Sequence, residues 1–230
     1  MKTIGLIGGM SWESTSHYYA TINREINRRL GGFHSAKILL VSVDFADIEN
    51  LQSAGNWQAA GNLLAHAALQ LQAAGAECIV ICTNTMHKVA SQIELAVKIP
   101  LLHIADATGR ALVAKQIKQV ALLGTAFTMS QDFYKRRLAD NFPLSVSVPN
   151  AEDQEAIHHI IYQELCQGVI TEASRETYIT IMNKLHQQGA QAIILGCTEI
   201  GLLVSADHTS IPLFDTTLIH SLAAVDFALS

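Results

Sequence analysis

Two cysteines stand at matching places in two similar stretches of the sequence, where each could exchange a proton with a small substrate. Cys82 directly follows the apolar run 78–81, and Cys197 closely follows the apolar run 192–195. One ionised and one protonated thiol can remove a proton from one face of a carbon atom and deliver a proton to the opposite face. The two thiols exchange these roles when the reaction reverses. The pattern therefore indicates inversion of a carbon stereocentre.

Polar residues follow both cysteines along the chain. They are Thr83, Asn84 and Thr85 after Cys82, and Thr198 and Glu199 after Cys197. A strand that opens onto a helix presents backbone N–H groups and the positive end of the helix dipole, and both stabilise anions. This field is expected to lower the pKa of each thiol below its reference value of about 8.5. We therefore interpret Cys82 and Cys197 as reactive residues rather than as packing residues.

The other two cysteines and the histidines give weaker signals. Cys78 and Cys166 have no matching partners, so we interpret both as small buried side chains. The cysteines show neither CxxC spacing nor a disulfide-dense pattern. The adjacent pair His158-His159 would point to different sides of a helix. The sequence therefore predicts no metal site.

The elements that must position these residues alternate between short apolar runs and longer helical stretches. This alternation is typical of βαβ units in an α/β protein with parallel sheets. The expected strands span residues 3–6, 38–43, 78–81, 101–104, 120–123, 144–148, 192–195 and 213–214. The expected helices span residues 14–29, 57–74, 154–167 and 172–188.

An internal repeat divides the chain into two similar halves. Segments 4–9, 75–83 and 99–102 recur in the same order, and at nearly the same spacing, as 120–125, 189–198 and 211–214. The period is too long for a solenoid, so it indicates a duplicated domain.

The repeat predicts where the two domains divide. We expect a first α/β domain formed by residues 1–112 plus 206–230 and a second formed by residues 113–205. The segment from Ile211 onward is expected to return and complete the first domain. Open α/β sheets bind ligands at the carboxyl ends of their strands, so the site is expected in the cleft between the domains.

Composition excludes several classes of protein. Half of the residues are hydrophobic and only 15% are charged, which favours a sizeable core over disorder. No apolar stretch is long enough to span a bilayer, and the N-terminal run is too short for a signal peptide. The net charge is −5 and the basic residues are scattered, so no nucleic-acid or membrane partner is expected. The sequence predicts a cytoplasmic protein that acts on a small molecule.

The segments 79–87 and 193–200 resemble the two cysteine signatures of the aspartate/glutamate racemases, which work without pyridoxal phosphate. The resemblance extends through 8–14, 124–128 and 214–216, so it covers essentially the whole chain. It is strongest to the broad-specificity amino-acid racemase and aspartate racemase branch. It implies two pseudo-symmetric Rossmann-like domains, an amino-acid substrate, no cofactor and commonly a homodimer.

The resemblance also implies roles for individual residues. Cys82 and Cys197 would be the two acid/base groups. The residues that would contact the substrate are Met10, Gln52, Thr83, Asn84, Thr85, Thr125, Thr128, Glu164, Thr198 and Glu199. Hydroxyls at Thr125 and Thr128 would suit a carboxylate, although each could instead serve as a turn or cap residue.

Departures from the family pattern bear on the substrate. Cell-wall glutamate racemases carry an Asp-Ser pair where this chain has Met10-Ser11, and a histidine where it has Glu199. Aspartate-specific members tend to have arginine where Gln52 stands, and a neutral amide cannot form a bidentate charged pair with a carboxylate. Glu164 lies near a position that can carry a basic residue in those enzymes. The expected substrate is therefore aspartate, with glutamate or a broader set of amino acids as the further options.

Two alternatives remain open at this point. A related isomerase of the maleate or hydantoin type would use the same frame, and the maleate type predicts a covalent adduct on one cysteine and no racemisation. A small-molecule sensor that has lost the chemistry predicts binding without turnover, although it has no need for a matched pair of thiols.

Overall fold

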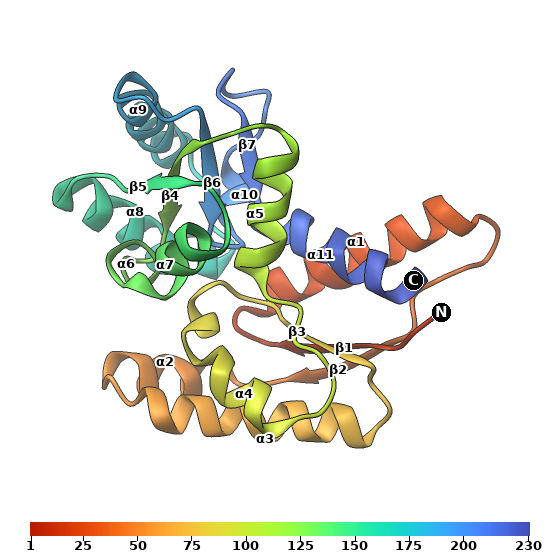
Figure 1. Ribbon diagram of the computed structural model, residues 1–230. Helices are drawn as coiled ribbons and strands as arrows, with labels where there is room; N and C mark the ends of the chain where they lie inside the picture. Colours follow the sequence, from red (N-terminus) through yellow and green to blue (C-terminus); the bar gives the residue numbers. More distant parts are fainter. The chain divides into compact units, whose positions relative to one another are not determined.

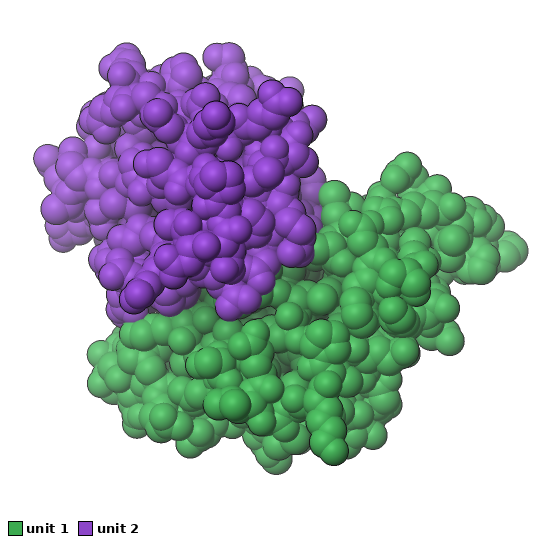
Figure 2. All heavy atoms as spheres, viewed as in Figure 1, with its two compact units in different colours: residues 1–104, 220–230 green, residues 105–219 purple.

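The computed structural model describes residues 1–230, and the chain divides into two compact units (Figure 2). Unit 1 consists of Met1–Ile104 and His220–Ser230, and unit 2 consists of Ala105–Ile219. The chain therefore leaves unit 1 earlier, and returns to it later, than the expected boundaries at residues 112 and 206. Each unit is an α/β domain with a parallel sheet (Figure 1), as predicted.

The sheet of unit 1 has the strand order β2-β1-β3. Its strands are β1 (Ile4–Gly8), β2 (Ile38–Ser42) and β3 (Cys78–Ile81). The register pairs Ile4 with Ile38 on one side and with Cys78 on the other. The expected strand at 101–104 is reduced to a single bridge between Leu101 and Ile79, because a helix already begins at Ile104.

Helices cover both faces of this sheet, which is why its central strand is apolar throughout. The helices are α1 (Trp12–Leu30), α2 (Phe45–Ser53), α3 (Trp57–Ala73), the 3₁₀ helix η1 (Thr85–Val89), α4 (Ala90–Ala96) and the latter part of α11 (Thr216–Leu229). Helices α1 and α11 lie on one side of this sheet and α3 and α4 on the other (Figure 1). Ile4 and Leu6 pack with residues of α1 and α11, whereas Ile7 packs with residues of α3 and α4. This alternation follows from the two-residue period of a strand.

The sheet of unit 2 has the strand order β5-β4-β6-β7. Its strands are β4 (Gln119–Gly124), β5 (Ser145–Ser147), β6 (Ala192–Gly196) and β7 (Leu213–Asp215). The expectation that the chain from Ile211 onward completes the first domain was wrong for β7. This strand pairs with β6, with Leu213 opposite Ile193, and only residues from His220 onward belong to unit 1.

The helices of unit 2 connect its strands along the chain. They are α5 (Ile104–Ala114), which begins at the last residue of unit 1, α6 (Ala126–Ser130), α7 (Asp132–Asn141), α8 (Ala151–Gln163), η2 (Leu165–Gln167), α9 (Glu172–Gln187) and α10 (Ile200–Leu203). Residues of α8 and α9 bury one face of β4 and β6 in a single apolar core. None of the helices combines the length and the hydropathy that a bilayer span requires.

The internal repeat of the sequence corresponds to a repeat of backbone pairing. The Ile79 N–H donates to the carbonyl of Pro100, and the Ile193 N–H donates to the carbonyl of Pro212, both at 2.9 Å. Leu101 and Leu213, the next residues, form the equivalent parallel pairings. The two units therefore share one arrangement. In unit 1, β1 pairs with β3 and β3 pairs with the bridge residue Leu101; in unit 2, β4 pairs with β6 and β6 pairs with β7.

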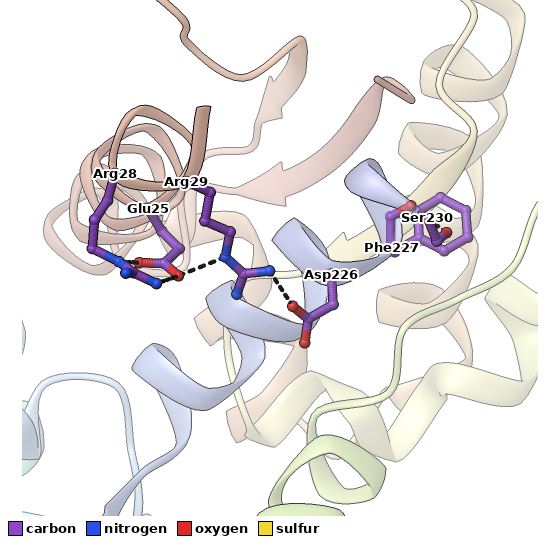
Figure 3. Close-up of polar contacts among 6 residues, drawn as sticks. All are labelled: Glu25, Arg28, Arg29, Asp226, Phe227 and Ser230. Atoms are coloured by element: carbon purple, nitrogen blue, oxygen red, sulfur yellow. Dashed lines mark hydrogen bonds and ion pairs between the residues drawn. The ribbon is translucent and has the colours of Figure 1, made fainter. Parts of the chain in front are cut away.

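Ion pairs on the surface of unit 1 join α1 to α11 (Figure 3). Glu25 accepts from Arg28 and from Arg29, each at 2.7 Å, and Arg29 also contacts Asp226 at 2.6 Å. Hydrogen bonds from the two arginines lower the pKa of Glu25 to about 2. The C-terminal helix is also held by its apolar face, which packs against the sheet.

Glu25→Gln is expected to lower the thermal unfolding midpoint at neutral pH, because both arginines lose a charged acceptor. A carboxylate with a depressed pKa stabilises the fold above its unfolded-state pKa and loses this effect as the pH falls toward about 2. The difference between wild type and variant should therefore shrink below about pH 4.5. Thermal unfolding followed by circular dichroism from pH 7 to pH 3 checks this, with the exposed Glu94→Gln as a control for lost charge. A difference in unfolding midpoint that stays constant from pH 7 to pH 3 would contradict a lowered pKa of Glu25.

Candidate functional site

Most of the residues singled out in the sequence directly follow the carboxyl ends of strands, whereas Gln52 lies on α2 (Phe45–Ser53) and Glu164 at the end of α8 (Ala151–Gln163). In unit 1, Ile7 of β1 pairs with Ile81 of β3, so the chain segments beyond them emerge side by side. In unit 2, Gly124 of β4 pairs with Gly196 of β6 in the same way. Strand ends of this kind are where parallel α/β sheets bind ligands.

Cys82 is the first residue beyond β3 and is completely buried. Its N–H donates to the carbonyl of Ile7 at 2.9 Å, and its own carbonyl accepts from the hydroxyl of Ser14 at 3.5 Å. The side chain belongs to the apolar core that includes Leu6 and Tyr18. Burial without a charged partner raises the pKa of the Cys82 thiol well above its usual range.

Cys197 occupies the equivalent place beyond β6 and has a charged neighbour. Its thiol donates to Oε2 of Glu199 at 3.0 Å, and the hydroxyl of Thr198 donates to the same oxygen at 2.7 Å. Glu199 is itself only 2% exposed. Burial and the negative charge of Glu199 together raise the pKa of the Cys197 thiol well above its usual range.

The expectation that helix dipoles lower both thiol pKa values was therefore wrong. The helices that follow the cysteines, Thr85–Val89 and Ile200–Leu203, are short, and so they carry only a few aligned peptide dipoles. Removal of water from around the thiols disfavours the charged thiolate and outweighs these dipoles. Burial therefore shifts both thiols toward their protonated form.

The loop after Cys82 is built from buried polar residues. Thr83, Asn84 and Thr85 are all at most 9% exposed. The carbonyl of Thr83 contacts Nδ1 of His87 at 2.8 Å. His87 is also buried, and its position at the end of the segment 79–87 did not by itself predict the contact with Thr83.

Gln52, on α2, contacts the segment that follows Cys82. It is 4% exposed, and its amide nitrogen lies 3.0 Å from the sulfur of Met86. Met10, from the segment after β1, belongs with Met86 to one apolar core. Gln52, Met10 and Met86 are therefore uncharged side chains beside one apolar core.

Thr125 and Thr128 lie together beyond β4. Thr125 caps α6 by accepting from the Thr128 N–H at 3.3 Å, and the two hydroxyl oxygens are 3.2 Å apart. Thr125 therefore has the capping role that the sequence left open. Thr128 is fully buried.

Glu164 lies at the end of α8, and its carboxylate is directed to the start of α9. It accepts hydrogen bonds from the hydroxyls of Thr171 at 3.2 Å and Ser174 at 2.6 Å. These contacts hold the junction between the two helices.

The remaining cysteines form no crosslink. Cys78 is buried in the core of unit 1, as predicted, and Cys166 is partly buried against the core of unit 2. All four cysteines are free. Nowhere in residues 1–230 do three or more His, Cys, Asp or Glu side chains converge as metal ligands do.

Known proteins resemble this chain in sequence and in structure. The Asp/Glu/Hydantoin racemase family model matches residues 7–224, a range that contains both cysteines. A Yersinia pestis protein assigned as an Asp/Glu racemase is 56% identical, with 100% of both chains covered and a TM-score of 0.93. PH1733 of Pyrococcus horikoshii OT3, an aspartate racemase homologue, is 33% identical, with 100% of both chains covered and a TM-score of 0.85.

A further relative is a broad-specificity amino-acid racemase of Bacillus subtilis (strain 168), RacX. The two proteins are 25% identical over 157 residues, which is 65% of this chain and 64% of RacX. The match therefore spans just under two thirds of that relative's length. The names of all three relatives refer to racemases of amino acids.

Replacing Glu199 is expected to lower the pKa of Cys197, because the variant removes the negative charge beside the thiol. The change is Glu199→Gln in a Cys166→Ser background, since Glu199 also raises the pKa of Cys166. Titration of thiolate absorbance in the ultraviolet should show one thiol ionising at lower pH than in the parent. The same comparison with Cys197→Ser present should show no change, and an equal shift there would exclude Cys197 as its source.

Proposed function

We propose that this chain, which belongs to the Asp/Glu/Hydantoin racemase family, interconverts the L and D forms of an amino acid with the thiols of Cys82 and Cys197 as two acid/base groups. The observation that carries the proposal is the equivalence of the two cysteines. Cys82 follows β3, which pairs with β1, and Cys197 follows the equivalent β6, which pairs with β4, each at the carboxyl end of a parallel strand. A packing role gives no reason for the repeat to keep cysteine at both places.

The proposed reaction moves one proton in each step. One cysteine, as thiolate, takes the α-proton, so an S–H bond forms and the electron pair of the C–H bond remains on the α-carbon. The other thiol then gives its proton to the opposite face of that carbon, and its sulfur is left as thiolate. The enzyme ends with the roles of the cysteines exchanged. This chemistry requires both sulfurs to reach the same α-carbon.

Glu199 supplies a proton acceptor for one of the two thiols. Because the Cys197 thiol donates to its carboxylate, a proton can pass from sulfur to oxygen without crossing water. We assign Glu199 this role in place of a simple contact with the substrate side chain. Cys82 has no carboxylate among its polar contacts, which are to Ile7 and Ser14.

The carbanionic intermediate needs stabilisation, because an amino acid α-proton is only weakly acidic. Buried hydroxyl and amide groups at Thr83, Asn84 and Thr85 are suited to hold the substrate carboxylate, where the negative charge spreads. Groups of this kind act most strongly where water is excluded. The burial of these residues supports such a role.

The substrate side chain is proposed to meet Gln52, Met10 and Met86 in unit 1. Gln52, Met10 and Met86 bring no positive charge that would select a second carboxylate. We therefore propose a set of amino acids broader than aspartate and glutamate, with aspartate among them. The name of RacX, a broad-specificity amino-acid racemase, is consistent with this breadth.

Cys82→Ser and Cys197→Ser are each expected to abolish racemisation, because a hydroxyl is far too weak an acid to replace the thiol in either step. Incubation of each amino acid in D₂O, with chirality and α-deuteration followed together, measures the effect. Wild type should give inverted product that carries deuterium. Each single variant should at most exchange the α-proton of one enantiomer, and a different one for each variant. Full racemisation by both variants would falsify the two-thiol mechanism.

The same assay separates the alternative activities. A covalent adduct on one cysteine, with no inversion of any amino acid, would favour a maleate-type isomerase. Binding of amino acids with neither inversion nor exchange would favour a sensor. The matched control is Cys78→Ser, because Cys78 is buried in the core of unit 1 outside the proposed chemistry.

Gln52→Arg is expected to shift selectivity toward dicarboxylic substrates, because a guanidinium can bind a carboxylate through two charged hydrogen bonds. The ratio of kcat/KM for aspartate to that for asparagine should rise by about tenfold, a change of about 1.4 kcal/mol. Gln52→Glu should move the ratio in the opposite direction. An unchanged ratio in both folded variants would remove Gln52 from the substrate contacts.

A further inference from the structure

His87 lies five residues after Cys82, in the 3₁₀ helix Thr85–Val89, and is 3% exposed. Both nitrogens of its ring meet backbone groups. Nδ1 lies 2.8 Å from the carbonyl oxygen of Thr83, and Nε2 accepts from the N–H of Ile104 at 3.2 Å. The ring therefore connects the residue after Cys82 with the last residue of unit 1 before the chain enters unit 2.

These contacts define the protonation of the ring. The Ile104 N–H is a donor only, so Nε2 must be the unprotonated, accepting nitrogen. The carbonyl of Thr83 is an acceptor only, so Nδ1 must carry the proton and donate it. A doubly protonated ring would set an N–H against the N–H of Ile104. The structure thus requires a neutral His87 with its proton on Nδ1.

A second histidine holds the same stretch of backbone. His220 Nε2 lies 2.6 Å from the carbonyl of Leu102, and its Nδ1 lies 2.9 Å from the hydroxyl of Tyr18. By the same reasoning His220 donates to Leu102 and accepts from Tyr18. The rings of His87 and His220 lie 5.7 Å apart, and the ring of His103 lies 4.5 Å from that of His87. Residues 102–104 are therefore held by two histidines of unit 1.

We propose that His87 is a positioning residue, which fixes the backbone that carries the Cys82 thiol. Three contacts tie this segment to other parts of unit 1: the Cys82 N–H to Ile7, the Cys82 carbonyl to Ser14, and the Thr83 carbonyl to His87. Of these three contacts, only the one at Thr83 is linked to residue 104, because the same His87 ring also accepts from the Ile104 N–H. This inference rests on the proposed function, since positioning matters for catalysis only if Cys82 exchanges the α-proton.

The inference is specific to the ring of histidine. Asparagine places an amide N–H near the position of Nδ1 and can still donate to Thr83, but it is too short to accept from Ile104. Glutamine places an amide oxygen near the position of Nε2 and can cap Ile104, but it leaves the Thr83 carbonyl without its donor. The two variants therefore separate the effect of the hydrogen bond to the Thr83 carbonyl from the effect of the hydrogen bond from the Ile104 N–H.

The test measures turnover and the ratio of α-deuterium exchange to inversion for both enantiomers in D₂O. His87→Ala is expected to lower kcat by about tenfold to a hundredfold, because small displacements of a reacting group are costly. It should also raise the ratio of exchange to inversion for the same enantiomer as Cys82→Ser does. His87→Asn should recover most of the activity and His87→Gln should not. The control is His186→Ala, which removes a similar bond from a histidine to a backbone carbonyl on α9, 2.7 Å from Ala190.

Several results would overturn the inference. One is a His87→Ala protein with nearly normal turnover, and another is a loss in which exchange and inversion fall in parallel for both enantiomers. Equal activities of His87→Asn and His87→Gln would also overturn it. NMR of the ring nitrogens in wild type gives a readout that needs no activity, and a His87 protonated on Nε2 would refute the assignment. A wild type that neither inverts nor exchanges any amino acid would instead refute the proposed function, and this inference with it.

Discussion

The parallel register of β1 with β3, and of β4 with β6, is the constraint on which the candidate site depends. Ile7 pairs with Ile81 in unit 1, and Gly124 pairs with Gly196 in unit 2. Because apolar residues on both faces of these strands are buried, polar groups can be presented only where the strands end. A slip of one residue in β3 would turn the side chain of Cys82 to the other face of the sheet. The position of that thiol therefore depends on the packing of the whole core.

Much of the fold could be predicted from the sequence, because apolar runs and capping residues are local signals. β3 spans Cys78–Ile81 as predicted, and the repeat led to equivalent pairings in the two units. The helix α11 was missed because it is apolar on most sides and so lacks a clear amphipathic stripe. The partner of β7 was also missed. Which sheet a short strand joins is decided by long-range pairing with β6, which local pattern does not encode.

The chemistry of the candidate site was predictable in part. The types and order of residues around Cys82 and Cys197 pointed to thiol chemistry, but the direction of their pKa shifts did not follow from them. Desolvation is a property of the packed core, and it outweighs the short helices that follow the cysteines. The contact of His87 with Ile104 was likewise hidden, because the two residues lie far apart in the sequence and meet only in the folded unit.

The carboxylate beside one thiol and not the other has a consequence for the resting state of the protein. The backbone of the two units repeats, but the electrostatics around the two sulfurs do not. In a two-thiol racemase each turnover leaves the enzyme in the protonation form opposite to the one in which it started. Under the proposed role of Glu199 as a proton acceptor, the two forms would differ in energy, and one of them would predominate between turnovers. The free enzyme would then be mainly in the protonation form that accepts one of the two enantiomers. Return to that form would limit the rate when the product is abundant.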